Sequence, residues 1–173
     1  MILNIYCDAS TLVHEGSKSG VGVAITIHGE LYKTIGMYIG KVSNVKAELI
    51  GILVALREAL SIAETETVNV VRIICDCMPA LDLASGDSNP SSEETAEIVE
   101  AIDEVAIGID APIEFQWVRA HNGNKFNEMA DKIAYDHAHN WPYHSKGRRR
   151  SDSDGGRGKF SHVLLVHETR GLQ

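Results

Sequence analysis

The first part of the chain carries short apolar segments whose periodicity favours β-strands. Residues 2–7 form an apolar run that is rich in strand formers. Residues 21–27 alternate and are rich in β-branched side chains, a break follows at 29–30, and a similar pattern resumes over 31–39. The glycine- and serine-rich residues 14–20 are expected to connect the first strand to this hairpin. The pattern therefore predicts three antiparallel strands.

The pattern changes to a helical period over residues 44–63. Its apolar side chains recur at about 100° per residue and form one stripe, made of Leu49, Ile52, Leu53, Leu56, Leu60 and Ala63. Glu48 lies on the border of this stripe, roughly 80° from its centre by the same step. We therefore expect an amphipathic helix whose Glu48 carboxylate leans toward the sheet.

The rest of the chain alternates strands with helices. Residues 68–75 form a nearly continuous apolar run, as expected of a strand that is covered on both faces. Ser91 and Glu94 match a capping box ahead of a helix. The further elements that we expect are a short helix over 79–84, a helix over 93–106, a strand over 113–118 and a helix over 124–139 with Met129, Ala130, Ile133 and Ala134 on one side. The order βββαβααβα predicts an α/β fold with a mixed five-stranded sheet flanked by helices.

The composition changes beyond residue 140. The length of 173 residues suits one domain and an extension. We assign residues 1–140 to the domain, residues 141–159 to a basic linker rich in glycine, serine and arginine, and residues 160–173 to a C-terminal tail. Residues 160–166 are apolar again and favour one late strand.

The net charge of −8 hides an uneven distribution. Residues 1–145 hold nine basic and 21 acidic residues, a balance of −12, whereas residues 146–173 hold seven and three, a balance of +4. An acidic body repels nucleic acid unless bound cations or a basic appendage compensate. The arginines Arg148, Arg149 and Arg150 are consistent with two interpretations, a solvated tail or an arm that grips nucleic acid.

Several features favour a protein of the cytoplasm without a membrane segment. No uncharged apolar run approaches the roughly 18 residues that cross a bilayer. The first residues reach an acidic side chain at Asp8 and lack the features of a secretory signal. Cys7, Cys75 and Cys77 are an odd number and argue against a disulfide framework. Strand alternation is expected to turn them away from the neighbouring aspartates as buried thiols.

Four carboxylates occupy positions that suit chemistry. Asp8 ends the first predicted strand, Asp76 ends the fourth, Glu48 borders the core face of the first helix, and Asp131 lies in the last helix. Ligands often bind at strand ends in such folds, and crowded carboxylates need cations to neutralise them. A purely oxygen donor set suits Mg²⁺ or Mn²⁺. Taken singly, each aspartate is also consistent with a turn former or a solvated helix residue.

Five segments, in order, resemble the motifs of type 1 ribonuclease H. They are DAS at 8–10, SNVKAEL at 43–49, ICD at 74–76, WVRAHNG at 117–123 and NEMAD at 127–131. The resemblance covers roughly residues 2–140. Each motif alone is weak, but their common order makes the signal specific.

The resemblance implies a ribonuclease H-like fold and endonucleolytic cleavage of the RNA strand of an RNA/DNA hybrid, leaving 5′-phosphate and 3′-hydroxyl ends. It implies that Asp8, Glu48, Asp76 and Asp131 hold two divalent ions, Mg²⁺ or Mn²⁺. His121 is implied as the fifth catalytic residue, which assists proton transfer or product release. The resemblance also implies substrate-binding positions, which are Ser10, Ser43, Asn44 and Asn127. It leaves the tail unexplained, so Arg148, Arg149 and Arg150 are candidate substrate-binding residues from their charge alone.

The chain departs from the family pattern at several points. Ala9 and Ala120 stand where the family usually has glycine, and Cys77 and Met78 replace a polar pair that follows the third carboxylate. Residues 79–93 are too short for the basic protrusion with which some members grip hybrids. Two other functions stay open, a junction resolvase-like nuclease and a non-catalytic nucleic-acid module, although the latter is expected to lack a carboxylate. The oligomeric state also stays open.

Overall fold

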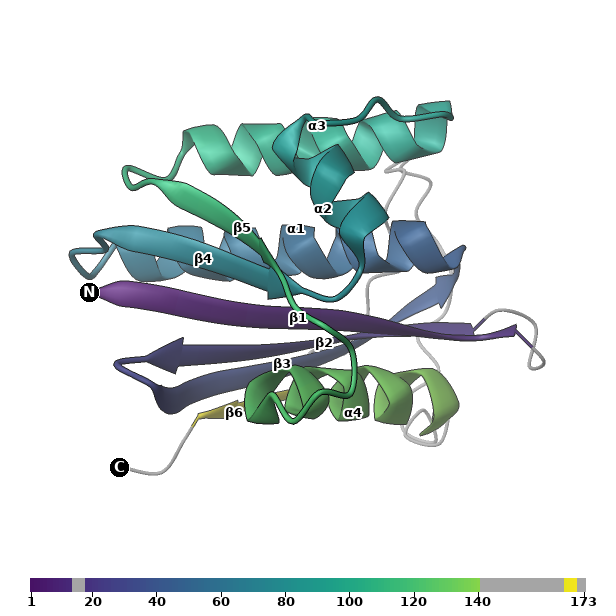
Figure 1. Cartoon of the computed structure of the whole chain (residues 1–173), viewed down its shortest axis with the longest axis horizontal. Coiled ribbons are helices and arrows are strands. Elements are labelled where there is room, and N and C mark those ends of the chain that lie inside the picture. Colours follow the sequence, from purple (N-terminus) through teal and green to yellow (C-terminus); the bar gives the residue numbers. More distant parts are fainter. Residues whose placement is uncertain (14–17, 141–166, 171–173) are drawn as a thin grey trace, which may run out of the picture.

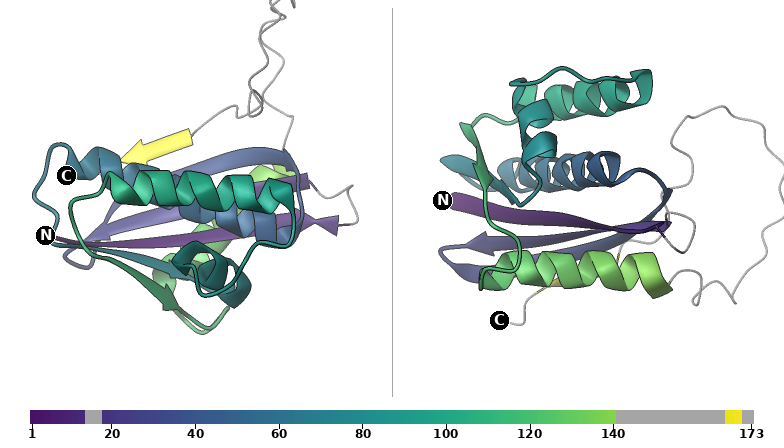
Figure 2. Two further views of the ribbon diagram at one scale, coloured as in Figure 1. Left: turned by 90° about the horizontal axis from the view of Figure 1, so that it is seen from above. Right: turned by 45° about the vertical axis from the view of Figure 1, so that its right-hand side comes forward.

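A mixed β-sheet carries helices on both of its faces (Figure 1). The computed structural model describes residues 1–13, 18–140 and 167–170. The strands are β1 (Ile2–Leu12), β2 (Lys18–Ile27), β3 (Glu30–Lys41), β4 (Val70–Cys75), β5 (Ile113–Trp117) and β6 (His167–Arg170). The helices are α1 (Asn44–Ala63), α2 (Met78–Ser85), α3 (Glu93–Ile107) and α4 (Lys125–Asn140). Figure 2 shows α1 and α3 stacked on one side of the sheet and α4 on the other.

The sheet has the order β5-β4-β1-β2-β3-β6. Strands β1 to β3 pair antiparallel, whereas β4 pairs parallel with β1, and β5 pairs parallel with β4. This confirms the predicted mixed sheet of five strands. A sixth strand, β6, extends it by pairing antiparallel with β3. The late strand predicted over 160–166 lies outside the described residues.

Strand β1 is longer than predicted, which changes the position of Asp8. The antiparallel pairing of β1 with β2 continues from Leu3 to Leu12, because residues 18–20 belong to β2 rather than to a connection. The parallel pairing of β1 with β4 ends earlier, at Tyr6 and Ile74. Asp8 therefore lies within β1, at the point where the strand has lost its neighbour on one side.

Helix α1 has the predicted bounds but is buried over more than one stripe. The sheet covers one side of it and α3 packs against another. Buried residues consequently include Ala47, Val54 and Ala55 in addition to most of the predicted stripe. Glu48 is also buried and contacts Cys75 of β4, in agreement with the predicted lean of its carboxylate toward the sheet.

The start of α3 differs by one residue from the predicted capping box. Ser92, not Ser91, is the N-cap, and its Oγ accepts a hydrogen bond from Thr95 N at 3.2 Å. Because the helix begins at Glu93, Thr95 is the third helical residue, where the backbone N–H faces the cap. Glu94 instead pairs with Lys46 of α1.

Helix α4 lies very close to β2 because both surfaces carry small residues. A Cβ added at Gly22 would fall inside the contact distance of the Ala130 carbonyl oxygen, and one added at Gly20 would meet the backbone of Ala134. Ala130, Ala134 and Ala138 are buried along the facing side of α4. This packing sets the depth at which α4 presents its side chains to the sheet.

No helix in the described part of the chain combines the length and the hydropathy that crossing a bilayer requires.

Candidate active site

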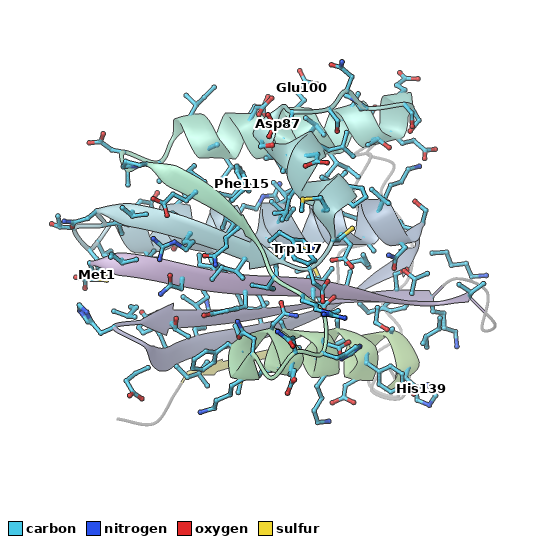
Figure 3. All side chains as sticks on the ribbon, in the orientation of Figure 1. Met1, Asp87, Glu100, Phe115, Trp117 and His139 are labelled. Atoms are coloured by element: carbon cyan, nitrogen blue, oxygen red, sulfur yellow. The ribbon has the colours of Figure 1, made fainter. Side chains whose placement is uncertain are left out.

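Three carboxylates from distant parts of the chain meet beside the middle of the sheet. Asp8 comes from β1, Glu48 from the first turns of α1, and Asp76 directly follows β4. One oxygen atom of each lies within 4.8 Å of one oxygen of each of the others. In Figure 3, Trp117, which opposes Cys75 in the sheet, lies near the centre of the view, whereas Met1 lies at the left edge. The cluster therefore forms at the carboxyl end of β4, away from the start of β1.

Each carboxylate of this cluster has a neutral hydrogen-bond donor. Ala9 N donates to Asp8 Oδ1 at 2.7 Å, and Asn127 Nδ2 donates to Asp76 Oδ2 at 3.1 Å. The Cys75 thiol donates to Glu48 Oε2 at 3.8 Å. These contacts orient the three side chains, but they bring no positive charge to the cluster.

Burial and mutual repulsion raise the proton affinity of two carboxyl groups. Asp8 and Glu48 are 6% and 4% exposed. Burial, with repulsion from Asp76 and Asp131, raises the pKa of Asp8 to about 8. Burial, followed by the proximity of Cys75 and the charges of Asp8 and Asp76, raises the pKa of Glu48 to about 11. Ionising both groups together is costly unless a cation lies between them.

The donor set fits a hard divalent cation. All three close ligand atoms are carboxylate oxygens, which Mg²⁺ and Mn²⁺ prefer, and soft ligands are not among them. A divalent ion would also offset the repulsion that raises the two pKa values. Among the residues that the structure describes, Asp8, Glu48 and Asp76 form the one group with this geometry.

The fourth carboxylate, Asp131, lies beside the cluster on α4. It is near enough to Asp8 to raise the pKa of that residue. Its Oδ2 lies 3.7 Å from His121 Nδ1, in a pair whose side chains are 39% and 77% exposed. Asp131 therefore stands between the buried carboxylates and an exposed imidazole.

The fold and the acidic cluster agree with a comparison of the sequence against known protein families. The RNase H family model matches residues 2–139. The chain belongs to the RNase H family. Together with the Asp-Glu-Asp cluster, this membership identifies an enzyme of the RNase H type, a nuclease.

Solved RNase H structures share this fold at low sequence identity. RNase H1 from Halobacterium salinarum is 17% identical with a TM-score of 0.68, over 79% of this chain and 97% of that one. The N-terminal RNase H domain of a Mycobacterium tuberculosis protein is 18% identical with a TM-score of 0.67, over 79% and 98%. LC11-RNase H1, solved in complex with an RNA/DNA hybrid, is 17% identical with a TM-score of 0.67, over 78% and 97%. None of the curated proteins matches the sequence significantly.

The RNase H motif at 117–123 begins at the last residue of β5 and continues as a loop with strained backbone at His121. His121 has a φ of 50°, in the left-handed region that residues other than glycine rarely adopt, and Gly123 has a φ of 77°. Gly123 N donates to Glu128 Oε1 at 3.0 Å, which ties the loop to α4. Strained residues of this kind concentrate at functional sites.

Asn124 caps the N-terminus of α4 and thereby orients its first turn. Its Oδ1 accepts hydrogen bonds from Phe126 N at 3.2 Å and from Asn127 N at 3.3 Å. The predicted helix included Asn124, but its capping role was not recognised, although asparagine before a helix is a known signal. Asn127, whose backbone N–H donates to this cap, donates through its side chain to Asp76 Oδ2.

The predicted substrate-binding residues occupy different environments. Ser43 and Asn44 lie exposed at the start of α1, where the Ser43 hydroxyl makes no cap hydrogen bond. Ser10 is half-buried two residues beyond Asp8, and strand alternation places it on the same face. Asn127 is only 3% exposed and bonds to Asp76. The candidate arm, Arg148, Arg149 and Arg150, lies outside the described residues.

The cysteines are free thiols, and one has a contact that the sequence did not predict. Cys7 and Cys75 are buried, as predicted, and Cys77 is half-buried. Strand alternation does separate Cys75 from Asp76, but it turns the thiol toward Glu48 of α1. The contact was missed because it depends on how deeply α1 packs on the sheet.

Trp117 makes a second contact that the sequence did not predict. Its Nε1 donates to the Asp76 carbonyl oxygen at 2.9 Å, and Val118 N donates to the Cys75 carbonyl oxygen at 3.0 Å. The end of β5 therefore fixes the backbone that carries Asp76. The available signal was the position of Trp117 at the start of the WVRAHNG segment.

Proposed function

We propose that this RNase H family member hydrolyses the RNA strand of RNA/DNA hybrids and leaves 5′-phosphate and 3′-hydroxyl ends. The observation that carries the proposal is the convergence of Asp8, Glu48 and Asp76 within 4.8 Å on this fold. One structural relative, LC11-RNase H1, was solved with an RNA/DNA hybrid. A bound hybrid in a protein of similar fold supports the same class of substrate here.

The four carboxylates would hold two divalent ions, Mg²⁺ or Mn²⁺, with Asp8, Glu48 and Asp76 as the close ligands and Asp131 at the rim. When bound, such a pair of ions activates the attacking water and stabilises the leaving oxygen. Asp8 and Glu48 contribute buried negative charge, and the donors from Ala9 and Cys75 orient their oxygens. These fixed contacts reduce the rearrangement that substrate binding requires.

His121 is proposed to move protons at the edge of the site. Its exposed imidazole can exchange protons with water, and a histidine side chain can both accept and donate a proton. Asp131 Oδ2 lies 3.7 Å from His121 Nδ1, which places the imidazole beside the cluster. His121 thus assists proton transfer or product release.

Substrate contacts are proposed along the surface next to the cluster. Ser43 and Asn44 offer a hydroxyl and an amide at the exposed start of α1, and a shallow groove beside them includes Lys41 and Lys46. Ser10 offers a hydroxyl on the face of Asp8. Distinguishing RNA from DNA requires a contact with the 2′-hydroxyl, which such groups can make.

The charge distribution favours a second region of contact with the nucleic acid, apart from the acidic cluster. The body is acidic, so the divalent ions and the basic segment containing Arg148, Arg149 and Arg150 would offset its repulsion of phosphates. We propose that this segment acts as an arm on the hybrid. We also place the enzyme in the cytoplasm.

Cleavage assays with Mg²⁺ on four substrates test the proposed function. We expect cleavage of the RNA strand of a hybrid and little cleavage of duplex DNA, duplex RNA or branched DNA. Asp8→Asn should reduce the rate by more than about 100-fold, because loss of a ligand costs more than loss of a residue that supports one. Preferred cleavage of branched DNA would instead favour a junction resolvase, and binding without cleavage would favour a non-catalytic module.

A further inference from the structure

A buried amide of α4 reaches the acidic cluster. Asn127 is 3% exposed, and its Nδ2 donates to Asp76 Oδ2 at 3.1 Å. Its backbone is fixed by the Asn124 cap, and α4 is held against β2 by the close approach at Gly22. The amide therefore has little freedom to move away from Asp76.

The other end of this amide has no protein partner. Within residues 1–13, 18–140 and 167–170, Asn127 Oδ1 is the buried side-chain nitrogen or oxygen atom that lacks a hydrogen bond. Buried acceptors of this kind are rare in folded proteins and destabilise them unless a ligand or water supplies a donor. A flipped amide does not resolve this, because it would place Oδ1 against the Asp76 carboxylate, which is also an acceptor.

The acidic cluster itself suggests the missing donor. Mg²⁺ and Mn²⁺ bound by a few carboxylates retain several water ligands, and each of these waters is a strong hydrogen-bond donor. Ligating carboxylates are in turn commonly oriented by hydrogen bonds from residues that do not touch the metal. Asn127 has a donor for the carboxylate and an acceptor for a water on the same rigid group.

We propose that Asn127 is a positioning residue with two contacts. Its Nδ2 holds Asp76 in the orientation that binds the cation, and its Oδ1 accepts a hydrogen bond from a water bound to that cation. The inference rests on the proposed function and deepens it, because it assigns the buried amide to the cation site rather than to direct contact with the hybrid.

Replacing Asn127 by leucine separates this role from a merely structural one. Leucine has a similar size and no polar atoms, so Asn127→Leu removes both contacts and also removes the unpaired acceptor. If the amide had only a structural role, Asn127→Leu would have a lower thermal midpoint in the absence of metal, and its affinity for metal would be unchanged. The positioning role predicts that the midpoint of the metal-free protein is not lowered, while the dissociation constant for Mn²⁺ increases roughly tenfold to 100-fold.

Titration of Mn²⁺, followed by the electron paramagnetic resonance signal of the free ion, measures this constant without any cleavage. Thr26→Val is the matched control, since Thr26 is 1% exposed and its Oγ1 donates only to the Asn4 carbonyl oxygen in β1. It should leave Mn²⁺ binding unchanged. Asp76→Asn is the positive control and should weaken binding. If Asn127→Leu does not fold, Asn127→Ala should show the same direction of change.

Activity provides a second readout. The cleavage rate of Asn127→Leu should recover at high Mg²⁺ concentration with KM for the hybrid unchanged, which an altered fold would not allow. Unchanged Mn²⁺ affinity in Asn127→Leu, with weakened binding in Asp76→Asn, would overturn the role of Asn127 and leave the proposed function intact. Unchanged affinity in both variants would overturn the cation site and, with it, both proposals.

Discussion

At the scale of single residues, the hydrogen bonds to the acidic cluster within the described part of the chain come from neutral donors and not from cationic side chains. The backbone of Ala9, the thiol of Cys75 and the amide of Asn127 each orient one carboxylate. Neutral donors fix geometry without competing with a divalent ion for negative charge. Ionising these carboxyl groups together is consequently unfavourable unless a cation binds. The raised pKa values of Asp8 and Glu48 reflect this cost.

The metal-free protein should therefore lose stability as pH rises. Burial raises the pKa of Asp8 from 3.8 to about 8 and that of Glu48 from 4.5 to about 11. The folded state thus binds both protons more tightly than the unfolded state, and this stability is complete below pH of about 4. Above it, the free energy of unfolding falls by up to about 1.4 kcal/mol per pH unit for each group, until the pH passes the folded pKa.

Thermal midpoints in a chelator between pH 4.5 and 8 measure this effect. Addition of Mg²⁺ should raise the midpoint more at pH 8 than at pH 5, because the ion replaces the protons. Asp8→Asn should reduce the pH dependence and the response to Mg²⁺. A midpoint that rises steadily with pH in the chelator would contradict the raised pKa values.

Substitution of His121 should impair turnover and leave folding intact. The side chain is 77% exposed and packs little, so His121→Ala should change the free energy of unfolding by less than about 0.5 kcal/mol. Loss of a proton-transfer group should lower kcat by about 100-fold or more, with unchanged affinity for the hybrid. Asn122→Ala, a change at the next exposed residue of the same loop, is the control. Equal losses in the two variants would assign the effect to the loop rather than to the imidazole.

At the scale of elements, the close approach of α4 to β2 sets the position of Asp131 and Asn127. Gly22 opposes Asp8 in the sheet and lies under Ala130 of α4. Any side chain at this position would push the helix away from the sheet. The small residues on both surfaces therefore influence the site by setting the distance between α4 and the sheet.

Two alanine substitutions at glycine should have opposite effects on stability. Gly22→Ala places a Cβ inside the contact distance of the Ala130 backbone and should destabilise the fold by about 1–3 kcal/mol, with loss of activity as Asp131 moves. Gly51→Ala in α1 meets its nearest neighbours only at 3.6–3.8 Å and should stabilise the fold by about 0.5–1 kcal/mol. Chemical unfolding measures both. Equal stability of the two variants would argue against this packing.

The elements were predictable where one periodicity dominates. The apolar stripe from Leu49 to Ala63 was enough to place α1 at its observed bounds. The end of β1 was not predictable in this way, because residues 18–20 have turn-like composition and become a strand only through pairing with β1. The cap of α3 differed by one residue, since neighbouring serines at 91 and 92 satisfy the same local signal and the helix start decides between them.

The candidate site was predictable in its clustered carboxylates but not in its supporting contacts. Asp8, Glu48 and Asp76 were named from their positions and from the ordered motifs, and the structure brings them together. The contacts of Cys75 with Glu48 and of Trp117 with the Asp76 carbonyl depend on the packing of α1 and the pairing of β5. Such packing distances are not encoded in periodicity or in motif spacing.

At the scale of the whole molecule, the charge is distributed unevenly between an acidic body and a basic segment near the C-terminus. The balance is −12 over residues 1–145 and +4 over residues 146–173. Under the proposed function, the cations at the acidic cluster and the basic segment would both attract phosphates. Added salt should weaken the second contribution more than the first.

Neutralising the proposed arm should flatten the salt dependence of hybrid binding. Replacing Arg148, Arg149 and Arg150 by glutamine keeps the residues of β6 in the chain, whereas truncation after His144 removes them. The slope of log affinity against log salt should decrease by up to about 2 to 3, since each phosphate contact contributes about 0.7 to 0.9. Arg57→Gln, at an exposed residue of α1, is the control. An unchanged slope and affinity in the triple variant would rule out the arm.

Anomalous diffraction from crystals grown with Mn²⁺ tests the cation site most directly. We predict a strong anomalous peak within coordination distance, about 2.1 Å to 2.3 Å, of Asp8, Glu48 and Asp76. A second peak about 3.5–4 Å away should appear beside Asp131 when a hybrid is bound. Crystals in which these carboxylates show no peak, while Mn²⁺ binds elsewhere on the protein, would contradict the assignment of the acidic cluster as the catalytic centre.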